Sequence, residues 1–301
     1  MNVTAETVKQ LRERTGAGMM ECKRALVETG GDLDAAAELM RKQGLAKADK
    51  KAARIAAEGM IVIEKSADGR AAAMVEVNCE TDFVAREQDF GGFAADVARV
   101  ALAVRAVSIE ALLAAKLPSG ETVDERRRAL IAKIGENISV RRVVRVEAQG
   151  QLGAYLHGTR IGALVALDAG EAGLARDLAM HVAASNPKYL SIAQVPAEEM
   201  AKEREILTEQ AKGDPKNQGK PDHILAQIVE GKVRKALSEI TLLGQPFVRD
   251  DKVSVEKLLA GANAKLATYE RYEVGAGIEK KQDDFVAEVM AQVKGAAGGK
   301  H

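Results

Sequence analysis

The sequence is poor in aromatic side chains, which make up 3% of its 301 residues, and it contains no tryptophan. It has only two cysteines, Cys22 and Cys79, and neither lies in a metal or redox motif, so a disulfide framework is not expected. A net charge is also missing, because 44 basic residues balance 44 acidic ones. Without a positive field, direct binding of nucleic acid is not expected as the main role.

Long apolar runs are absent too: no stretch reaches the roughly 18 residues that would suggest a membrane span. The first six residues lack the basic and apolar regions of a signal peptide. These absences predict a cytoplasmic protein with no membrane partner. The remaining mixture, 47% hydrophobic and 29% charged, is typical of a globular chain long enough for two or more domains.

The sequence lacks the residue patterns of common enzymes. His157 and His181 have no cysteine or carboxylate at metal-ligand spacing, and no phosphate-binding or dinucleotide-binding glycine motif is present. Cys79 and Glu80 could in principle act as a nucleophile and its base. However, adjacent strand residues point to opposite faces, so these two side chains are poorly placed to act together. We therefore expect no enzyme, no catalytic residue, no cofactor and no metal.

The N-terminal 45 residues predict a compact three-helix module. Thr4 and Asp32 are expected to cap the first and third helices, and Gly44 is expected to end the third. Met19 and Met20 lie in the glycine loop between the first two helices, where they either form a contact surface or fill the core. Residues 46–56, which are basic and alanine-rich, predict a helical or flexible linker.

Two related α+β units with antiparallel sheets are predicted for the core. The first spans residues 57–140 and starts with a hairpin turned at Asp68-Gly69. The second spans 141–190 and 241–277, with a strand at 141–146 as its first element. Residues 94–98 and 175–179 are similar and fall in the helix that follows each hairpin, which favours a common plan.

Residues 191–240 predict an insertion of two amphipathic helices joined by a turn rich in glycine and proline. Such an antiparallel hairpin is expected to protrude, and its partner could be a second copy of the chain. Residues 278–301 predict a C-terminal helix, at 282–293, and a glycine-rich tail.

The junction between the strand at 71–77 and the helix at 93–104 is the main candidate for binding. It contains Thr81-Asp82-Phe83-Val84. An exposed ring here would be a plausible anchor for a protein partner. The alternative is that Phe83 packs beneath the following helix.

Several long motifs, taken together and in order, resemble the bacterial elongation factor Ts family over residues 1 to about 293. They are residues 11–20, 77–85, 134–137, 157–158, 160–162 and 244–248. The resemblance implies an N-terminal module like a ubiquitin-associated domain, a core of two α+β units and a coiled-coil projection. It also implies guanine-nucleotide exchange on elongation factor Tu, a GTPase.

The resemblance assigns roles to particular residues. It implies that Phe83, supported by Asp82 within the Thr81 to Val84 segment, wedges into the GTPase domain near the nucleotide and Mg²⁺. It implies further partner contacts by a set of residues elsewhere: Met19, Met20, Ile134, Gly135, His157 and Val248. Glu80 departs from the family, where glutamine is common.

Two other classes of function remain open from the sequence. An RNA-binding translation protein would use the basic linker and residues 126–128, and its affinity would fall steeply with salt. A self-associating scaffold would use the helical hairpin and would form homo-oligomers without a GTPase. Neither explains the ordered motifs.

Overall fold

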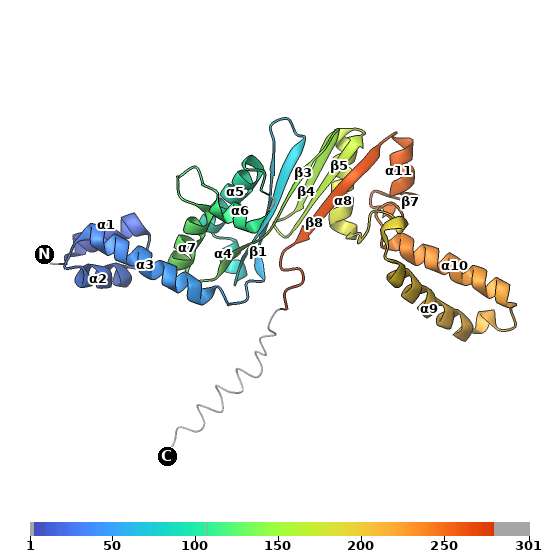
Figure 1. Cartoon of the computed structure of the whole chain (residues 1–301), viewed down its shortest axis with the longest axis horizontal. Helices are drawn as coiled ribbons and strands as arrows, with labels where there is room; N and C mark the ends of the chain where they lie inside the picture. Colours follow the sequence, from blue (N-terminus) through green and yellow to red (C-terminus); the bar gives the residue numbers. More distant parts are fainter. Residues whose placement is uncertain (1–2, 107, 280–301) are drawn as a thin grey trace, which may run out of the picture.

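The computed structural model describes residues 3–106 and 108–279, without the side chains of 45–49. The fold is α+β, with N-terminal helices, two three-stranded antiparallel sheets and a projecting pair of helices arranged along an elongated molecule (Figure 1). Within the described chain, no helix is both long and apolar enough to cross a bilayer. The predicted C-terminal helix at 282–293 lies outside the described residues.

Three helices form the N-terminal module: α1 (Ala5–Thr15), α2 (Met19–Glu28) and α3 (Leu33–Lys51). The predicted caps are present. The Thr4 hydroxyl accepts from the Thr7 amide at 3.2 Å, and Asp32 Oδ1 accepts from the Asp34 amide at 2.8 Å. The buried apolar residues of the three helices form a small core of their own: Val8, Leu11, Cys22, Ala25, Leu26 and Ala36.

The prediction that Gly44 ends the third helix is wrong, because α3 continues to Lys51 and includes part of the predicted linker. Gly44 faces α7 (Val123–Ile134), and a Cβ built on it would lie 3.1 Å from Ala132 Cβ. The glycine therefore allows two helices to pack closely, a use that looks the same in sequence as a stop signal.

The first sheet has the order β1 (Glu58–Lys65), β2 (Ala71–Cys79), β3 (Ile138–Glu147). Its central strand β2 is buried on both faces. One face packs with the core under helices, including Val75 and Val77, and the other, including Met74, packs with the second sheet. The helices on this side are α4 (Asp82–Ala85), α5 (Gln88–Ala103), α6 (Ile109–Ala114) and α7.

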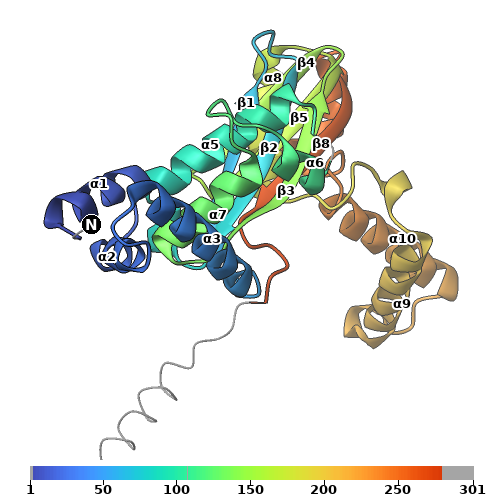
Figure 2. The same cartoon turned by 60° about the vertical axis from the view of Figure 1, so that its left-hand side comes forward.

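The second sheet has the order β4 (Gln151–His157), β5 (Ile161–Ala169), β8 (Lys265–Glu273). Helices α8 (Ala172–Ser185) and α11 (Val255–Gly261) contribute to the apolar cluster on its outer side. Alternate residues of β5 divide between the two faces: Val165 belongs to the cluster with α8, and Leu164 to the cluster shared with β2. The core is therefore helices, sheet, sheet, helices, as Figures 1 and 2 show from two directions.

The prediction that the strand at 141–146 opens the second unit is wrong. It belongs to β3, which pairs with β2 of the first sheet, with Val143 opposite Val75. With β3 moved, both units share one plan, since each has a hairpin, a helix and a third strand antiparallel to the hairpin's second strand. The similar segments 94–98 and 175–179 supply part of the buried faces of α5 and α8.

The helical hairpin consists of α9 (Ala197–Gly213) and α10 (Asp222–Glu239), with short 3₁₀ turns at Ile192–Gln194 and Pro215–Asn217. It projects from the end of the molecule opposite the N-terminal helices (Figure 1). Where it joins the body, the amides of Lys188 and Tyr189 donate to the Ile240 carbonyl. The chain then forms a small hairpin of β6 (Pro246–Phe247) and β7 (Asp250–Ser254), which was not predicted from the sequence.

Candidate protein-interaction site

Phe83 lies on the four-residue helix α4, and 76% of its surface is exposed. The alternative prediction, that the ring packs beneath the following helix, is wrong. The neighbouring Val84 is buried in the first core and holds the loop to the body. The loop thus presents its ring to solvent from a fixed base, an arrangement suited to insertion into a partner.

The sequence 81–86 forms this short helix for local reasons. The Thr81 hydroxyl accepts from the Val84 amide at 3.4 Å, which satisfies one free donor at the start of the helix. Asp82 lies in the first turn, and its carboxylate is 2.8 Å from the Arg86 guanidinium one turn later. Asp82 is therefore a half-buried acid, paired with Arg86, beside the exposed ring.

A second loop, residues 134–137, fastens the Phe83 loop to the body. Glu136 Oε2 accepts from the amides of Glu80 and Thr81 at 3.1 and 3.0 Å, and its Oε1 accepts from the Thr81 hydroxyl at 2.7 Å. In return the Asn137 amide donates to Glu80 Oε1 at 2.6 Å. These bonds bring the predicted contact residues Ile134 and Gly135 close to the Phe83 loop.

Ile134 and Gly135 also have structural roles where α7 ends. Ile134 is half-buried against the first core. Gly135 has a φ of 90°, and its amide closes the helix by donating to the Ile131 carbonyl. Lys51, at the end of α3, donates to the Gly135 carbonyl. The end of the N-terminal helix therefore meets the same turn that holds the Phe83 loop.

Cys79, which precedes the loop, is buried, and its thiol lies 3.1 Å from the Thr81 carbonyl. Burial, aided by the nearby carboxylates of Glu136 and Glu58, raises the pKa of Cys79 to about 12. The thiol therefore stays protonated at neutral pH and does not serve as a nucleophile. Among the described residues, no group of three His, Cys, Asp or Glu is placed to hold a metal ion.

Met19 and Met20 begin α2 and are 53% and 68% exposed. The alternative that both fill the core is wrong. In Figures 1 and 2 their helix lies at one end of the molecule, beyond the helices that cover the first sheet. The structure does not bring these methionines together with the Phe83 loop.

His157 is exposed at the end of β4, and the Tyr155 hydroxyl lies 3.4 Å from its Nδ1. The turn that follows reaches the first sheet. Its Thr159 carbonyl accepts from the Ile61 amide at 2.8 Å, and Arg160 forms an ion pair with Glu58 at 2.6 Å. His157 therefore lies on the second unit but next to the edge strand of the first.

Val248 is 47% exposed and follows the buried Phe247. The Val248 amide donates to Nδ1 of the buried His181 at 3.2 Å, so His181 Nε2 carries the proton and donates to Gln245 Oε1 at 3.0 Å. Burial lowers the pKa of His181 and keeps the ring neutral. This network was not predicted from the sequence, although His181 on a buried helix face and the polar Gln245 beside Phe247 were the available signals.

A buried ion cluster, also missed from the sequence, joins the two sheets. The Glu76 carboxylate accepts from Arg141 at 3.1 Å, from Arg142, and from the Gly275 amide at 2.8 Å. Burial by itself would raise the pKa of Glu76, but the Gly275 amide, Arg142 and Asn78 outweigh it and leave the pKa below its ordinary value. Arg142 also lies over the Tyr272 ring, 4.2 Å from its centre. A lone acid within the apolar strand 71–77 was the available signal.

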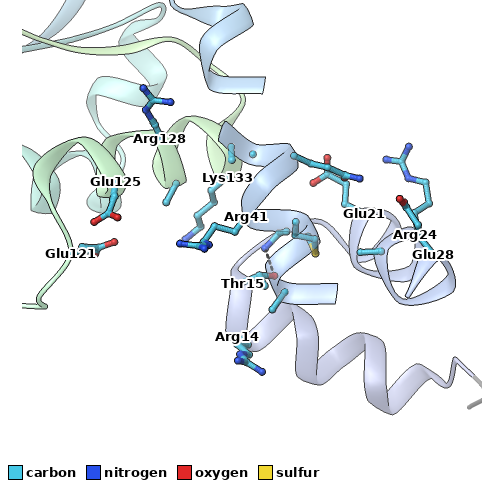
Figure 3. Close-up of a pocket in the computed structure, with 18 residues that line it drawn as sticks. Arg14, Thr15, Glu21, Arg24, Glu28, Arg41, Glu121, Glu125, Arg128 and Lys133 are labelled. Carbon is cyan, nitrogen blue, oxygen red and sulfur yellow. Dashed lines mark hydrogen bonds between the residues drawn. The ribbon is translucent and has the colours of Figure 1, made fainter. Parts of the chain in front are cut away.

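A cavity of about 620 Å³ lies between the N-terminal helices and α7 (Figure 3). Its wall mixes arginines, a lysine and glutamates with small apolar residues. Several charges are already paired, since Arg14 meets Asp34 and Lys133 meets Asp89. Phe83 and the two exposed methionines are not part of its lining. The cavity therefore does not coincide with the predicted contact residues.

Four arginines that would serve an RNA-binding protein lie close to acidic side chains. Arg127 and Arg128 lie 2.6 and 2.7 Å from Asp124, and Arg126 lies 4.0 Å from Glu121. In the linker, Arg54 lies 3.5 Å from Glu80. These arginines therefore lie beside acids of the same chain.

Comparison with known proteins identifies the family. A family model described as "Elongation factor TS" matches residues 80–276, which include the Phe83 loop. The chain is 58% identical to elongation factor Ts of Methylococcus capsulatus, covering 98% of this chain and 99% of that protein. It is 56% identical to elongation factor Ts of Thioalkalivibrio sulfidiphilus, covering 98% and 100%, and 54% identical to that of Legionella pneumophila strain Philadelphia 1, covering 97% and 99%. The chain belongs to the elongation factor Ts family of translation elongation factors.

Proposed function

We propose that this protein acts in the cytoplasm as the guanine-nucleotide exchange factor of elongation factor Tu. It binds the GDP form, promotes GDP release and so allows GTP to load, with no covalent chemistry. The observation that carries this proposal is the exposure of Phe83 on a loop whose neighbours are anchored in the core. In a chain with 3% aromatics, a ring left in solvent on such a base suits a partner that buries it.

Exchange requires that the factor and the nucleotide weaken each other's binding. Linkage makes this effect reciprocal. The factor can therefore promote GDP release only if it binds the nucleotide-free partner more tightly than the GDP-bound partner. A differential affinity of about 10⁴ corresponds to roughly 5.5 kcal/mol. Burial of one phenylalanine contributes about 1.5–3 kcal/mol, so Phe83 needs help from other contacts.

The remaining predicted contacts are spread along the molecule in a way that suits this need. Met19 and Met20 belong to the N-terminal module, and His157 and Val248 belong to the second unit. These residues would hold the partner while Asp82 and Phe83 insert near its nucleotide and Mg²⁺. Holding and wedging are then separate tasks for separate surfaces.

The test is whether binding of the partner and binding of GDP are coupled. The purified protein is immobilised, elongation factor Tu is added, and the bound amount is measured over a range of free GDP concentrations. We expect capture without nucleotide and release as GDP rises, in keeping with reciprocal linkage. Capture that does not depend on GDP would contradict exchange, and absence of capture would contradict the choice of partner.

A further inference from the structure

The turn at residues 135–137 contacts two segments that the proposed function uses separately. On one side, Glu136 and Asn137 exchange four hydrogen bonds with residues 80 and 81. On the other side, the Asn137 side chain donates to the carbonyls of Arg54 and Ala52, at 2.7 and 3.4 Å. The turn thus lies between the Phe83 loop and the end of the N-terminal helix α3.

The bonds to Glu136 are the ones that set the direction of the Phe83 loop. One carboxylate oxygen accepts both consecutive amides, of Glu80 and Thr81, and the other accepts the Thr81 hydroxyl. Hydrogen bonds to an ionised acceptor are stronger than neutral ones. The same Thr81 hydroxyl caps α4, so the carboxylate orients the cap and, through it, the helix that carries Phe83.

The loop has independent anchors at both ends. Cys79 is buried in β2, and Val84 is buried in the first core. Removing the Glu136 carboxylate would therefore leave the loop attached to the body but would deprive the amides of residues 80 and 81 of their acceptor. The expected result is a loop that explores more orientations, not an unfolded domain.

We infer that Glu136 is a positioning residue for Phe83: it holds the exposed ring in the orientation that the partner requires. This inference rests on the proposed exchange function. It explains why a glutamate follows Gly135 at the end of α7, since the left-handed glycine turns the chain so that the next carboxylate reaches the amides of the neighbouring loop. Glu136 acts through Phe83 and need not touch the partner.

The test is a double-mutant cycle of Glu136→Ala and Phe83→Ala, read as the rate at which labelled GDP leaves elongation factor Tu. We expect Glu136→Ala alone to slow release about tenfold, as for the loss of a charge-assisted hydrogen bond that orders a loop. If Glu136 acts only through Phe83, the double variant should be no slower than Phe83→Ala alone. Effects that simply multiply would contradict the inference.

Two further variants separate positioning from general damage. Glu136→Gln retains an acceptor for the two amides but loses the charge and the second accepting oxygen, so its rate should lie between those of the wild type and Glu136→Ala. Glu110→Ala, at an exposed acid in the first turn of α6, removes a carboxylate from the same unit and should leave the rate unchanged. A Gln variant as slow as the Ala variant, or a slow Glu110→Ala, would count against the inference.

Amide hydrogen exchange in the free protein tests the loop without the partner. In Glu136→Ala the amides of residues 80–84 should exchange faster than in the wild type, while the strand amides of 71–78 and the unfolding midpoint stay the same. Unchanged exchange at 80–84 would overturn the inference whatever the partner does. If the wild type fails to speed GDP release, the proposed function is wrong. In that case amide exchange alone tests whether Glu136 orders the Phe83 loop.

Discussion

Phe83 and Phe247 are placed in opposite environments. Phe83 contributes almost nothing to the core, whereas Phe247 is buried with its ring centre 5.8 Å from that of His181. The ring of Phe247 stabilises the fold near Val248, and the ring of Phe83 stays in solvent, as the proposed partner contact requires. Replacing Phe83 should therefore change binding without changing stability, because exposed substitutions usually alter the free energy of unfolding by less than about 0.5 kcal/mol.

His181 predicts how stability depends on pH. Burial lowers its pKa in the folded protein, whereas an imidazole in the unfolded chain has a pKa of about 6.5. Below that pH the unfolded chain binds a proton at His181 that the folded protein does not bind. The contribution of His181 to the free energy of unfolding is therefore complete above about pH 6.5 and declines below it. In urea unfolding experiments, the free energy of unfolding should decrease as the pH is lowered from about 7.5 to about 5.

The matched variants are His181→Asn and His157→Asn. His181→Asn retains an acceptor for the Val248 amide, loses the bond to Gln245, and should cost about 1–3 kcal/mol at neutral pH. As the pH is lowered, the free energy of unfolding of His181→Asn should also decrease less than that of the wild type. His157 is exposed, so His157→Asn should match the wild type. Equal pH dependence in wild type and His181→Asn would contradict this account of the network.

At the scale of elements, the packing of α8 on β4 depends on Gly153. A Cβ at this position would lie 1.9 Å from the Ala175 carbonyl oxygen, which belongs to the helix backbone and cannot move aside. Gly153→Ala should therefore lower the free energy of unfolding by about 2–3 kcal/mol, measured by urea denaturation. The helix and strand would have to separate to admit one methyl group.

Gly92 in α5 is the matched control, since a Cβ there meets nothing within 4 Å. Gly92→Ala should raise the free energy of unfolding by about 0.5–1 kcal/mol, because alanine favours a helix and restricts the unfolded chain. If Gly153→Ala were as stable as Gly92→Ala, close contact between α8 and β4 would be excluded.

The elements with strong periodicity were predictable from the sequence. Alternating apolar residues predicted the hairpin of β1 and β2, and helical spacing predicted α5, α8 and the paired helices α9 and α10. Two short helices were not predicted: α4 and α6 have four and six residues, too few to show a period. The prediction of the sheet to which β3 belongs was also wrong. A strand pattern shows which faces are buried, but it does not show which neighbouring strand it pairs with.

The candidate site was predictable only in part. An aspartate and a phenylalanine after a strand indicated a possible anchor, but exposure of the ring depends on how the loop is held. That support comes from Glu136, which is 55 residues further along the chain than Thr81. No local pattern reports a hydrogen bond between distant loops, so the role of Glu136 could not be found from spacing. For Glu76, the lone acid in an apolar strand was a signal, but the sequence does not show which arginines pair with it.

At the scale of the whole molecule, the hairpin of α9 and α10 is predicted to be an insertion that the core does not need. Its two ends meet where Tyr189 and Leu242 share a backbone hydrogen bond, and it has an apolar cluster of its own. Replacing residues 192–239 with a short glycine-serine linker should therefore leave a cooperatively folded protein, because closing a short loop costs little.

Two measurements define the role of the hairpin. The shortened protein should still reach the wild-type rate of GDP release at saturation, since Phe83 and Glu136 lie in the other unit. Light scattering of both proteins tests whether the hairpin mediates self-association, in which case only the full chain would form oligomers. A folded but inactive shortened protein would show that the hairpin takes part in exchange itself.

The two sheets pack face to face, and the Glu76 cluster joins them, so surfaces at both ends of the core are held in a fixed relation. A rigid body of this kind can transmit binding energy from distant contacts to one wedge. The elongated shape (Figure 1) and the layered core (Figure 2) are therefore part of the proposed mechanism.

Stopped-flow measurement of labelled GDP leaving elongation factor Tu, with wild type or Phe83→Ala, tests the central claim most directly. Loss of the ring should cost about 2–4 kcal/mol and slow release at limiting factor by about 30-fold or more. Val104→Ala, which trims an exposed apolar residue at the end of α5, serves as the control and should behave as the wild type. An unchanged rate with Phe83→Ala would contradict the wedge.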